Sequence, residues 1–292
     1  MAGLSAGAQL PSPRTLASAV SWVARRLSAA GIERARPEAQ VIVSSATGRT
    51  REDLLIRPDT PLSPHDTARL TALAHRRAGR EPLPYVLGEV EFHSLPFHIT
   101  PAAIVPRPET EILVEAALAR APRAGLAADV GTGCGAVAIA LARELPELRV
   151  IAVDISPLAL ALARRNCRRH GLAHRIFLVR GDLLAALRFP ADLIVANLPY
   201  IRTADFPGLE PEVRDWEPRI ALDGGDDGLA PIRRLSVQLF DHLCPGGCAA
   251  LEVGAGQAEE VAKLLARAGL SQPEILPDYA GIPRVVIGRR KG

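Results

Sequence analysis

Four consecutive residues, Asn197-Leu198-Pro199-Tyr200, carry the clearest chemistry in this sequence. They follow an apolar run at residues 191–196 whose Leu, Ile and Val predict a buried strand. Pro199 fixes its own φ and drives Leu198 into an extended conformation, which aims the Leu198 carbonyl. That carbonyl and the Asn197 side-chain oxygen suit the two hydrogens of a planar amino group, and Tyr200 adds a flat face. The tetrapeptide predicts a grip on an –NH2 group of a conjugated system, although an isolated match also fits a strand followed by an ordinary loop.

A second cluster lies at residues 129–135, where glycine alternates with other residues (DVGTGCG) after another predicted strand. Such glycines let the backbone take positive φ and let a ligand approach the main chain with no Cβ in the way. Asp154 directly follows the next predicted strand, which ends at Val153, and a carboxylate there can accept hydrogen bonds from both ribose hydroxyls. We expect a nucleoside to be held by Gly131, Thr132, Gly133, Cys134, Gly135 and Asp154.

The identity of the nucleoside is not fixed by these residues alone, because Gly131-x-Gly133-x-x-Ala136 also satisfies a dinucleotide fingerprint. However, the triple alternation of glycines resembles S-adenosylmethionine sites. Asp182 follows the third predicted strand, where such proteins contact the adenine, and Leu183 comes next. These elements, in this order, favour S-adenosylmethionine over a nicotinamide cofactor.

The totals exclude several classes of protein. The 292 residues are 48% apolar, which suits a soluble globular chain, and 35 basic residues against 32 acidic ones give a net charge of only +3. This near balance predicts no strong field for nucleic acid or an anionic membrane. No apolar run approaches the roughly 20 residues of a membrane span.

Four cysteines and the lack of a signal-peptide pattern predict a reducing, cytoplasmic compartment. Cys244 and Cys248 enclose Pro-Gly-Gly, which is turn chemistry, and no second ligand pair follows them. We therefore expect no metal site.

The elements that must position these residues fall into two groups. Helical spacing and capping patterns over residues 1–82 predict a small helical bundle, with a helix from Pro37 to Ala46 and capping boxes at Thr50 and Ser63. Its many arginines would suit ribosomal RNA or an acidic protein face, but a solvated surface is the favoured explanation. Residues 83–103 predict a hairpin or linker.

From residue 104 to 292 strands alternate with helices, which predicts an α/β domain. Its sheet should be mainly parallel and covered by helices on both faces.

With these features together, the chain resembles a class I methyltransferase that acts on an amino or amide nitrogen. Three further motifs narrow the resemblance to the bacterial release factor glutamine methyltransferases, the PrmC/HemK family. They are Arg80-x-Pro-x-x-Tyr85-x-x-Gly88, Pro106-Arg-Pro-Glu-Thr-Glu111 and Leu222-Asp-Gly-Gly-Asp-Asp-Gly-Leu229. The resemblance runs from about residue 15 to the end.

The resemblance implies a Rossmann-like domain with a seven-stranded sheet and an N-terminal helical domain that docks the release factor. The activity implied is methylation of the Gln side chain in the Gly-Gly-Gln loop of the factor. S-Adenosylmethionine would be held by the glycine loop, Asp154, Asp182, Leu183 and Asn197, and the glutamine amide by Asn197, Leu198, Pro199 and Tyr200. Two positions depart from the family: Leu198 replaces the usual second-position Pro, and Leu183 replaces a frequent Trp.

Other functions stay open. A ribosomal-protein glutamine methyltransferase would share almost every motif, and Asn-Leu-Pro-Tyr also occurs in ribosomal RNA adenine dimethyltransferases. A DNA or RNA amino-methyltransferase should bind nucleic acid in a salt-sensitive manner, and a non-catalytic nucleotide-binding module would lack methyl transfer. We expect a monomer whose partner is a release factor, with ribosome association left open.

Overall fold

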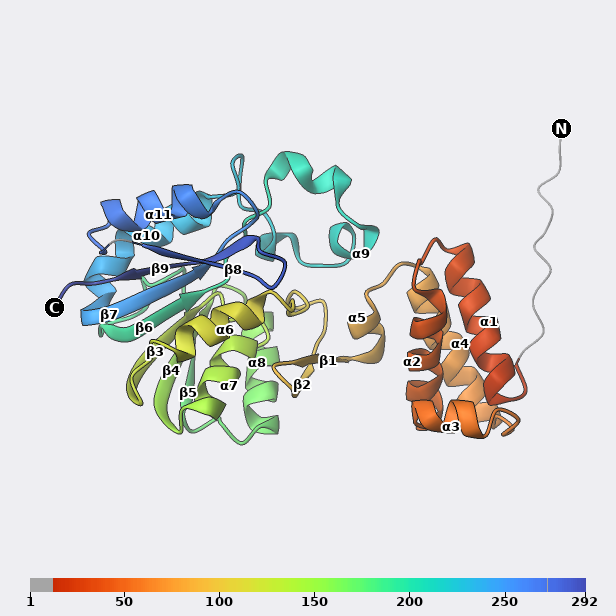
Figure 1. Cartoon of the computed structure of the whole chain (residues 1–292). Coiled ribbons are helices and arrows are strands. Elements are labelled where there is room, and N and C mark those ends of the chain that lie inside the picture. Colours follow the sequence, from red (N-terminus) through yellow and green to blue (C-terminus); the bar gives the residue numbers. More distant parts are fainter. Residues whose placement is uncertain (1–12, 272) are drawn as a thin grey trace. The chain divides into compact units, whose positions relative to one another are not determined.

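A computed structural model describes residues 13–271 and 273–292 of the chain (Figure 1). The chain divides between Leu87 and Gly88 into two compact units. The division falls inside the segment 83–103, which consists of a short helix, α5 (Leu83–Leu87), followed by a hairpin of β1 (Glu89–Phe92) and β2 (Leu95–His98).

The first unit is a bundle of helices α1 (Leu16–Ala29), α2 (Ala35–Thr47), α3 (Arg51–Ile56) and α4 (Pro64–Ala78). Thr50 and Ser63 each accept a hydrogen bond from the backbone three residues on, and both capping boxes are complete. The helix predicted to begin at Pro37 begins instead at Ala35, since the turn after Ile32 already places residues 35 and 36 in helical conformation. An apolar core contributed by α1, α2 and α4 closes the bundle.

The second unit is built on one seven-stranded sheet. Its strands are β3 (Ala124–Val130), β4 (Glu147–Asp154), β5 (Ile176–Arg180), β6 (Ala191–Ala196), β7 (Leu243–Glu252), β8 (Glu274–Pro277) and β9 (Pro283–Arg289). The spatial order is β5-β4-β3-β6-β7-β9-β8, in which β9 runs antiparallel to the other six strands. The mainly parallel sheet expected from alternating strands and helices is confirmed.

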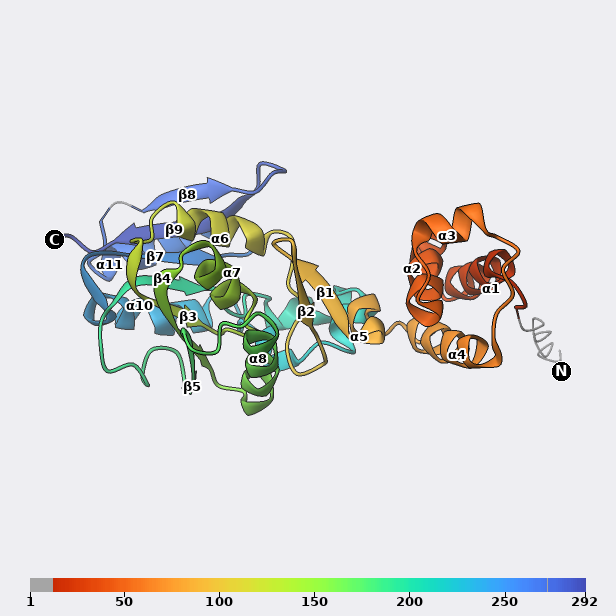
Figure 2. The same ribbon diagram turned by 90° about the horizontal axis from the view of Figure 1, so that it is seen from below.

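Helices cover both faces of this sheet, as Figures 1 and 2 show. Helices α6 (Thr110–Leu118), α7 (Ala136–Glu144) and α8 (Pro157–Arg169) lie on one face, and α10 (Ala230–His242) and α11 (Ala258–Arg267) on the other. Ser156 caps α8 with Pro157 at its first position, as the sequence predicts. The inner strands are accordingly apolar on both sides.

Two parts of this unit are absent from the sequence-based expectation. Strand β8 was not predicted, because it is short and ends in a proline, a residue that is rare inside strands. The connection from β6 to α10 holds only short helices: η1 (Thr203–Gly208), α9 (Pro211–Arg214) and η2 (Arg219–Ala221). This long irregular connection returns to the carboxyl edge of the sheet, where it forms part of a cavity.

Candidate active site

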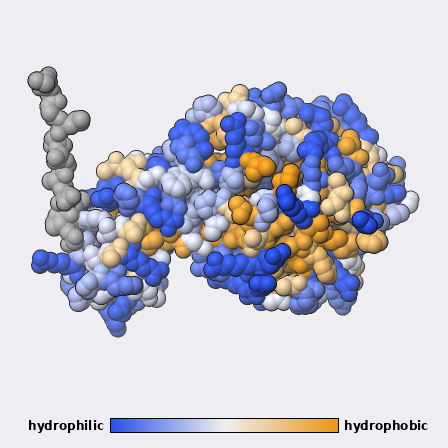
Figure 3. All heavy atoms as spheres, turned by 180° about the vertical axis from the view of Figure 1, so that it is seen from behind, coloured by the Kyte–Doolittle hydropathy of each residue, from blue (hydrophilic) through white to orange (hydrophobic). Residues whose placement is uncertain are grey.

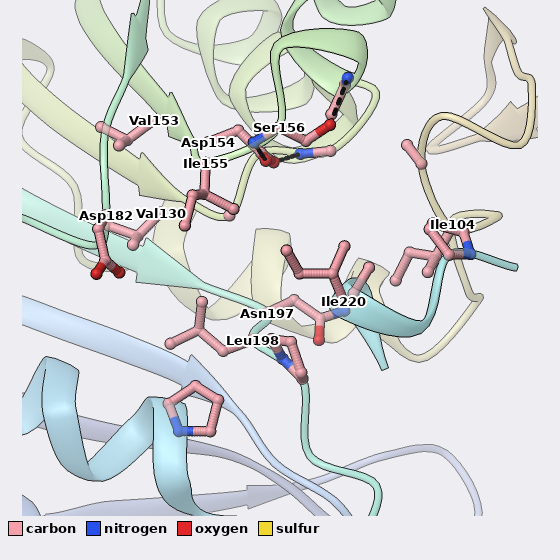
Figure 4. Close-up of a pocket in the computed structure, with 18 of the residues that line it drawn as sticks. Ile104, Val130, Val153, Asp154, Ile155, Ser156, Asp182, Asn197, Leu198 and Ile220 are labelled. Carbon is pink, nitrogen blue, oxygen red and sulfur yellow. Dashed lines mark hydrogen bonds between the residues drawn. The ribbon is translucent and has the colours of Figure 1, made fainter. Parts of the chain in front are cut away.

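The carboxyl ends of five parallel strands meet at one edge of the sheet, where ligands bind in open α/β folds. The chain passes outward in opposite directions from the β3–β6 pair, which makes this pair the switch point. A cavity of about 550 Å³ opens there, a volume within the usual range for small-molecule sites. Figure 4 shows it bounded by Asp154 to Ser156 on one side and by Asn197 and Leu198 on another.

The glycine loop adopts the conformation that its composition predicts. Gly131, Gly133 and Gly135 have φ of 75°, 56° and 86°, a region that favours glycine. Gly131 and Gly133 line the cavity. A Cβ on Gly131 would lie 3.1 Å from Leu198 Cδ2, so the loop packs directly on the tetrapeptide.

Thr132 and Cys134, which we expected to bind the nucleoside, are buried and are not among the residues that line the cavity. The Thr132 hydroxyl donates to Asp129 Oδ2 at 2.6 Å, and the same oxygen accepts from Ala138 N at 3.1 Å. Burial raises the pKa of Asp129 to about 6 and that of Cys134 to about 12. Their side chains shape the loop, and direct ligand contact through them stays a prediction.

Asn166 on α8 is a site residue that sequence analysis missed. It is fully buried, and its Nδ2 donates to the Cys134 carbonyl at 2.9 Å and to the His98 carbonyl at 3.0 Å. Its Oδ1 accepts from His98 N at 2.8 Å. One amide thus joins the glycine loop to the β1–β2 hairpin; the only sequence signal was a polar residue on the apolar face of a helix.

Asp154 lies at the end of β4, half-buried at the cavity wall (Figure 4). Its Oδ2 accepts from Gly133 N at 2.9 Å, and its Oδ1 accepts from Ser156 N at 2.8 Å. Burial raises the pKa of this carboxyl, and the backbone hydrogen bonds partly offset the rise. Since each carboxylate oxygen can accept about two hydrogen bonds, one position on each remains for a ribose hydroxyl.

Asp182 and Leu183 also line the cavity, after β5. Asp182 forms an exposed ion pair with Arg234 of α10. Leu183 has φ of 53°, a left-handed conformation that costs a non-glycine residue about 1 kcal/mol. The backbone at this position therefore turns an aliphatic side chain toward the cavity wall in place of the frequent Trp.

Asn197, Leu198 and Pro199 form the cavity wall opposite Asp154 (Figure 4). Asn197 Nδ2 donates to Thr110 Oγ1 at 3.0 Å, so its amide presents the nitrogen to α6. Among the described residues, no donor occupies Asn197 Oδ1 or the Leu198 carbonyl. Two acceptors are thus available next to each other in sequence, beside the cavity.

Tyr200 does not line the cavity but is held just behind it. Its carbonyl accepts from Gln257 Nε2 at 3.0 Å, and a Cβ on Gly228 would lie 2.4 Å from the same carbonyl oxygen. Burial raises the pKa of Tyr200 to about 12, which keeps the phenol neutral. Its contact with a substrate stays a prediction.

Two of the three motifs that carry the family resemblance contact this tetrapeptide. In Pro106-Arg-Pro-Glu-Thr-Glu111, Arg107 pairs with the buried Glu217 at 2.6 Å, and Thr110 contacts Asn197. Within Leu222–Leu229, Gly228 packs on the Tyr200 carbonyl. Sequence reasoning singled out both motifs by resemblance but did not predict which residues they would contact.

Two further wall segments were not predicted. Residues 101–104 and four residues of the later segment, Pro218, Ile220, Ala221 and Asp223, also line the cavity. Ile220 is an exposed side chain that lies near Asn197 (Figure 4). Figure 3 shows a broad band of hydrophobic residues on one face of this unit. Apolar walls with few polar groups are typical of sites for small organic ligands.

Nothing in the described ranges gathers three or more His, Cys, Asp or Glu side chains at metal-binding distance. Over those ranges, no helix is both long enough and apolar enough to cross a bilayer.

Comparisons with known proteins identify the family of the chain. Residues 18–88 match the family model of the PrmC N-terminal domain, and residues 108–206 match the methyltransferase small domain. Release factor glutamine methyltransferases from Geobacter sulfurreducens and Moorella thermoacetica are 45% and 46% identical to the chain, over 94% and 95% of its length and 96% and 99% of theirs. The one from Bradyrhizobium diazoefficiens is 40% identical over 95% of both chains. At these identities, over nearly the whole length of both chains, the chain belongs to the release factor glutamine methyltransferase family of S-adenosylmethionine-dependent enzymes.

Proposed function

We propose that the protein methylates the side-chain amide nitrogen of the Gln in the Gly-Gly-Gln loop of peptide chain release factors. The observation that carries this proposal is the pair of free acceptors, Asn197 Oδ1 and the Leu198 carbonyl, beside a cavity that Asp154 bounds on the other side. A primary amide has two N–H hydrogens, and this wall offers two oxygens for them.

The cavity fits S-adenosylmethionine, which supplies a methyl group activated on a sulfonium sulfur. Asp154 keeps acceptor positions for the ribose hydroxyls, and Gly131 and Gly133 leave open the surface that side chains would fill. Leu183 offers an apolar face to the adenine, and Asp182 a carboxylate near its edge. A side chain at position 131 would also crowd Leu198. The absence of a side chain at Gly131 therefore leaves room both for the cofactor and for the tetrapeptide.

An amide nitrogen is a poor nucleophile because its lone pair is delocalised into the carbonyl. Asn197 and the Leu198 carbonyl orient the nitrogen, and in-line transfer requires it roughly 3 to 3.5 Å from the methyl carbon. S-Adenosylmethionine would supply the methyl group, and Asn197 Oδ1 and the Leu198 carbonyl would stabilise the positive charge that develops on the substrate nitrogen. The surplus proton leaves the nitrogen after transfer, so no strong base is needed beforehand.

In this proposal the helical unit docks the release factor, and the enzyme acts as a cytoplasmic monomer in translation termination. The docking role of the helical unit is supported by the match of residues 18–88 to the PrmC N-terminal domain model. In this proposal, both the release factor and S-adenosylmethionine bind to groups of the chain itself, and no metal takes part.

The test is mass spectrometry of release factors after incubation with the protein and isotopically labelled S-adenosylmethionine. We expect one labelled methyl group on the loop glutamine, and none when that glutamine is replaced by alanine. Purified ribosomal proteins, ribosomal RNA and DNA in parallel reactions should remain unlabelled. If one of these molecules were labelled and the release factor were not, that molecule would be the substrate in place of the release factor.

A further inference from the structure

Glu252 is a buried carboxylate that the mechanism above does not use. It ends β7, and β7 pairs in parallel with β6 so that Leu251 lies opposite Ala196. Glu252 is therefore beside Asn197, and it is 1% exposed. Neither of its oxygens has a well-aligned hydrogen-bond donor among the described residues. Such an unsatisfied buried carboxylate is costly and calls for an explanation.

The groups around Glu252 belong to the tetrapeptide and its support. Burial raises the pKa of Glu252 to about 7, and the nearby Thr110 hydroxyl and Asn197 side-chain amide lower it although neither makes a well-aligned hydrogen bond to the carboxylate. Arg284 also lowers this pKa and Glu109 raises it, while the nearby Tyr200 phenol is neutral. Arg284 is itself paired with Asp278 at 3.2 Å. Thr110, one of the side chains near Glu252, is thus also the side chain that hydrogen-bonds to Asn197.

Thr110 stands between Glu252 and the amide. It is 4% exposed, and its oxygen accepts from Asn197 Nδ2 at 3.0 Å. A hydroxyl can donate as well as accept, so Thr110 alone would tolerate Asn197 turned by 180°, with Oδ1 toward α6 and Nδ2 toward the cavity. That orientation would place an N–H donor against the substrate –NH2 and would destroy the grip.

We propose that Glu252 is a positioning residue that sets the direction of the hydrogen bonds in the methyltransferase site. An ionised carboxylate only accepts, so it draws the hydrogen of the Thr110 hydroxyl toward itself. Thr110 Oγ1 is then left as an acceptor, which only Asn197 Nδ2 can satisfy. Asn197 Oδ1 must consequently face the substrate amide.

This arrangement predicts a pH effect. A protonated Glu252 carries a donor of its own and no longer fixes the direction of the Thr110 hydroxyl. Since the pKa of Glu252 is raised to about 7, kcat should rise with pH through that region. The inference rests on the proposed function, because it concerns the grip on the glutamine amide.

The test compares Glu252→Gln with the wild type in methyl transfer to a release factor. The Gln side chain has the same shape but both donates and accepts, so it permits either orientation of Asn197. We expect kcat to fall roughly 10- to 100-fold, as for a misoriented reacting group, with S-adenosylmethionine affinity unchanged. The rise of kcat through pH 7 should disappear in the variant.

Thr110 supplies the matched controls. Thr110→Val should reduce kcat as much as Glu252→Gln, and the double variant should lose little more, because both changes break one chain of hydrogen bonds. Thr110→Ser keeps the hydroxyl and should restore kcat to near the wild-type value. Thermal unfolding of every variant shows that each is folded.

A readout independent of turnover is the side-chain amide signal of Asn197 in 1H–15N NMR spectra. It should shift through pH 7 in the wild type and stay constant in Glu252→Gln. Unchanged kcat, pH profile and amide signal in folded Glu252→Gln would overturn the inference while wild-type methylation still supported the function. Absence of wild-type methylation would instead overturn the function itself.

Discussion

The two walls of the cavity are built in different ways. On the wall that we propose binds the cofactor, here called the cofactor wall, backbone N–H groups hold a carboxylate: Asp154 accepts from Gly133 and Ser156. On the wall that we propose binds the substrate, here called the substrate wall, side chains distant in sequence hold the tetrapeptide, since Thr110 contacts Asn197 and Gln257 contacts Tyr200. The first wall depends on local backbone conformation, and the second depends on the packing of separate segments.

The difference teaches which changes should separate binding from catalysis. A change on the cofactor wall should weaken affinity for the nucleoside and leave the amide grip in place. A change on the substrate wall should slow transfer and leave nucleoside affinity almost intact. Variants of single residues therefore test whether the walls act independently.

The largest effect is expected from Asn197→Ala. It removes one of the two acceptors, and loss of one preorganised group that stabilises developing charge costs roughly 10²- to 10³-fold in kcat. Calorimetry should give a nearly unchanged affinity for S-adenosylmethionine, while a methyl-transfer assay records the loss. Full activity in this variant would disprove the grip.

Asp154→Ala should have the opposite profile. Loss of one or two charge-assisted hydrogen bonds costs roughly 1.5 to 3 kcal/mol, which weakens S-adenosylmethionine binding by about 10- to 150-fold. At saturating cofactor, kcat should recover most of its wild-type value. Calorimetry and saturation kinetics measure the two quantities, and an unaltered affinity would remove Asp154 from the site.

Arg107→Met tests the support of the substrate wall. It leaves the carboxylate of Glu217, whose side chain is 1% exposed, without its cation. Because Arg107 is partly open to solvent, we expect about 1 to 3 kcal/mol of lost stability in urea unfolding, below the cost for a fully buried pair. Glu217→Gln removes the buried negative charge, so no cation is required beside it, and this variant serves as the milder control. Equal losses in the two variants would contradict this account.

The smallest effect is a pH dependence of stability. The folded-state pKa of Glu252 is raised to about 7 by burial, above its ordinary value of 4.5, so the folded state binds more protons than the unfolded state between these values. Its contribution to stability is complete below about pH 4.5 and is lost as the pH rises through 7. Urea unfolding from pH 5 to 8 should show a smaller decline in Glu252→Gln than in the wild type. An identical decline would mean that Glu252 titrates normally.

The cofactor wall was the more predictable one, for physical reasons. Positive φ at Gly131 and Gly133 is a local requirement that a glycine in the sequence indicates, and Asp154 is the last residue of its strand. The capping boxes at Thr50 and Ser63 are equally local and were confirmed. The first residue of α2 was predicted two positions too late, and strand β8 was not predicted. At both places the local sequence carries only a weak signal, and packing against neighbouring segments decides the conformation.

The sequence by itself determined the alternation of strands and helices that gives a mainly parallel sheet, the glycine loop, and the residue types that could bind a nucleoside and an amide, because each of these follows from local backbone preference and side-chain chemistry. Only the tertiary structure decided that Thr110, Asn166 and Glu252 support the site, since their partners are far away in the chain. It also decided which way the Asn197 amide points. That direction is a property of hydrogen-bond partners brought together by folding, which no spacing along the chain records.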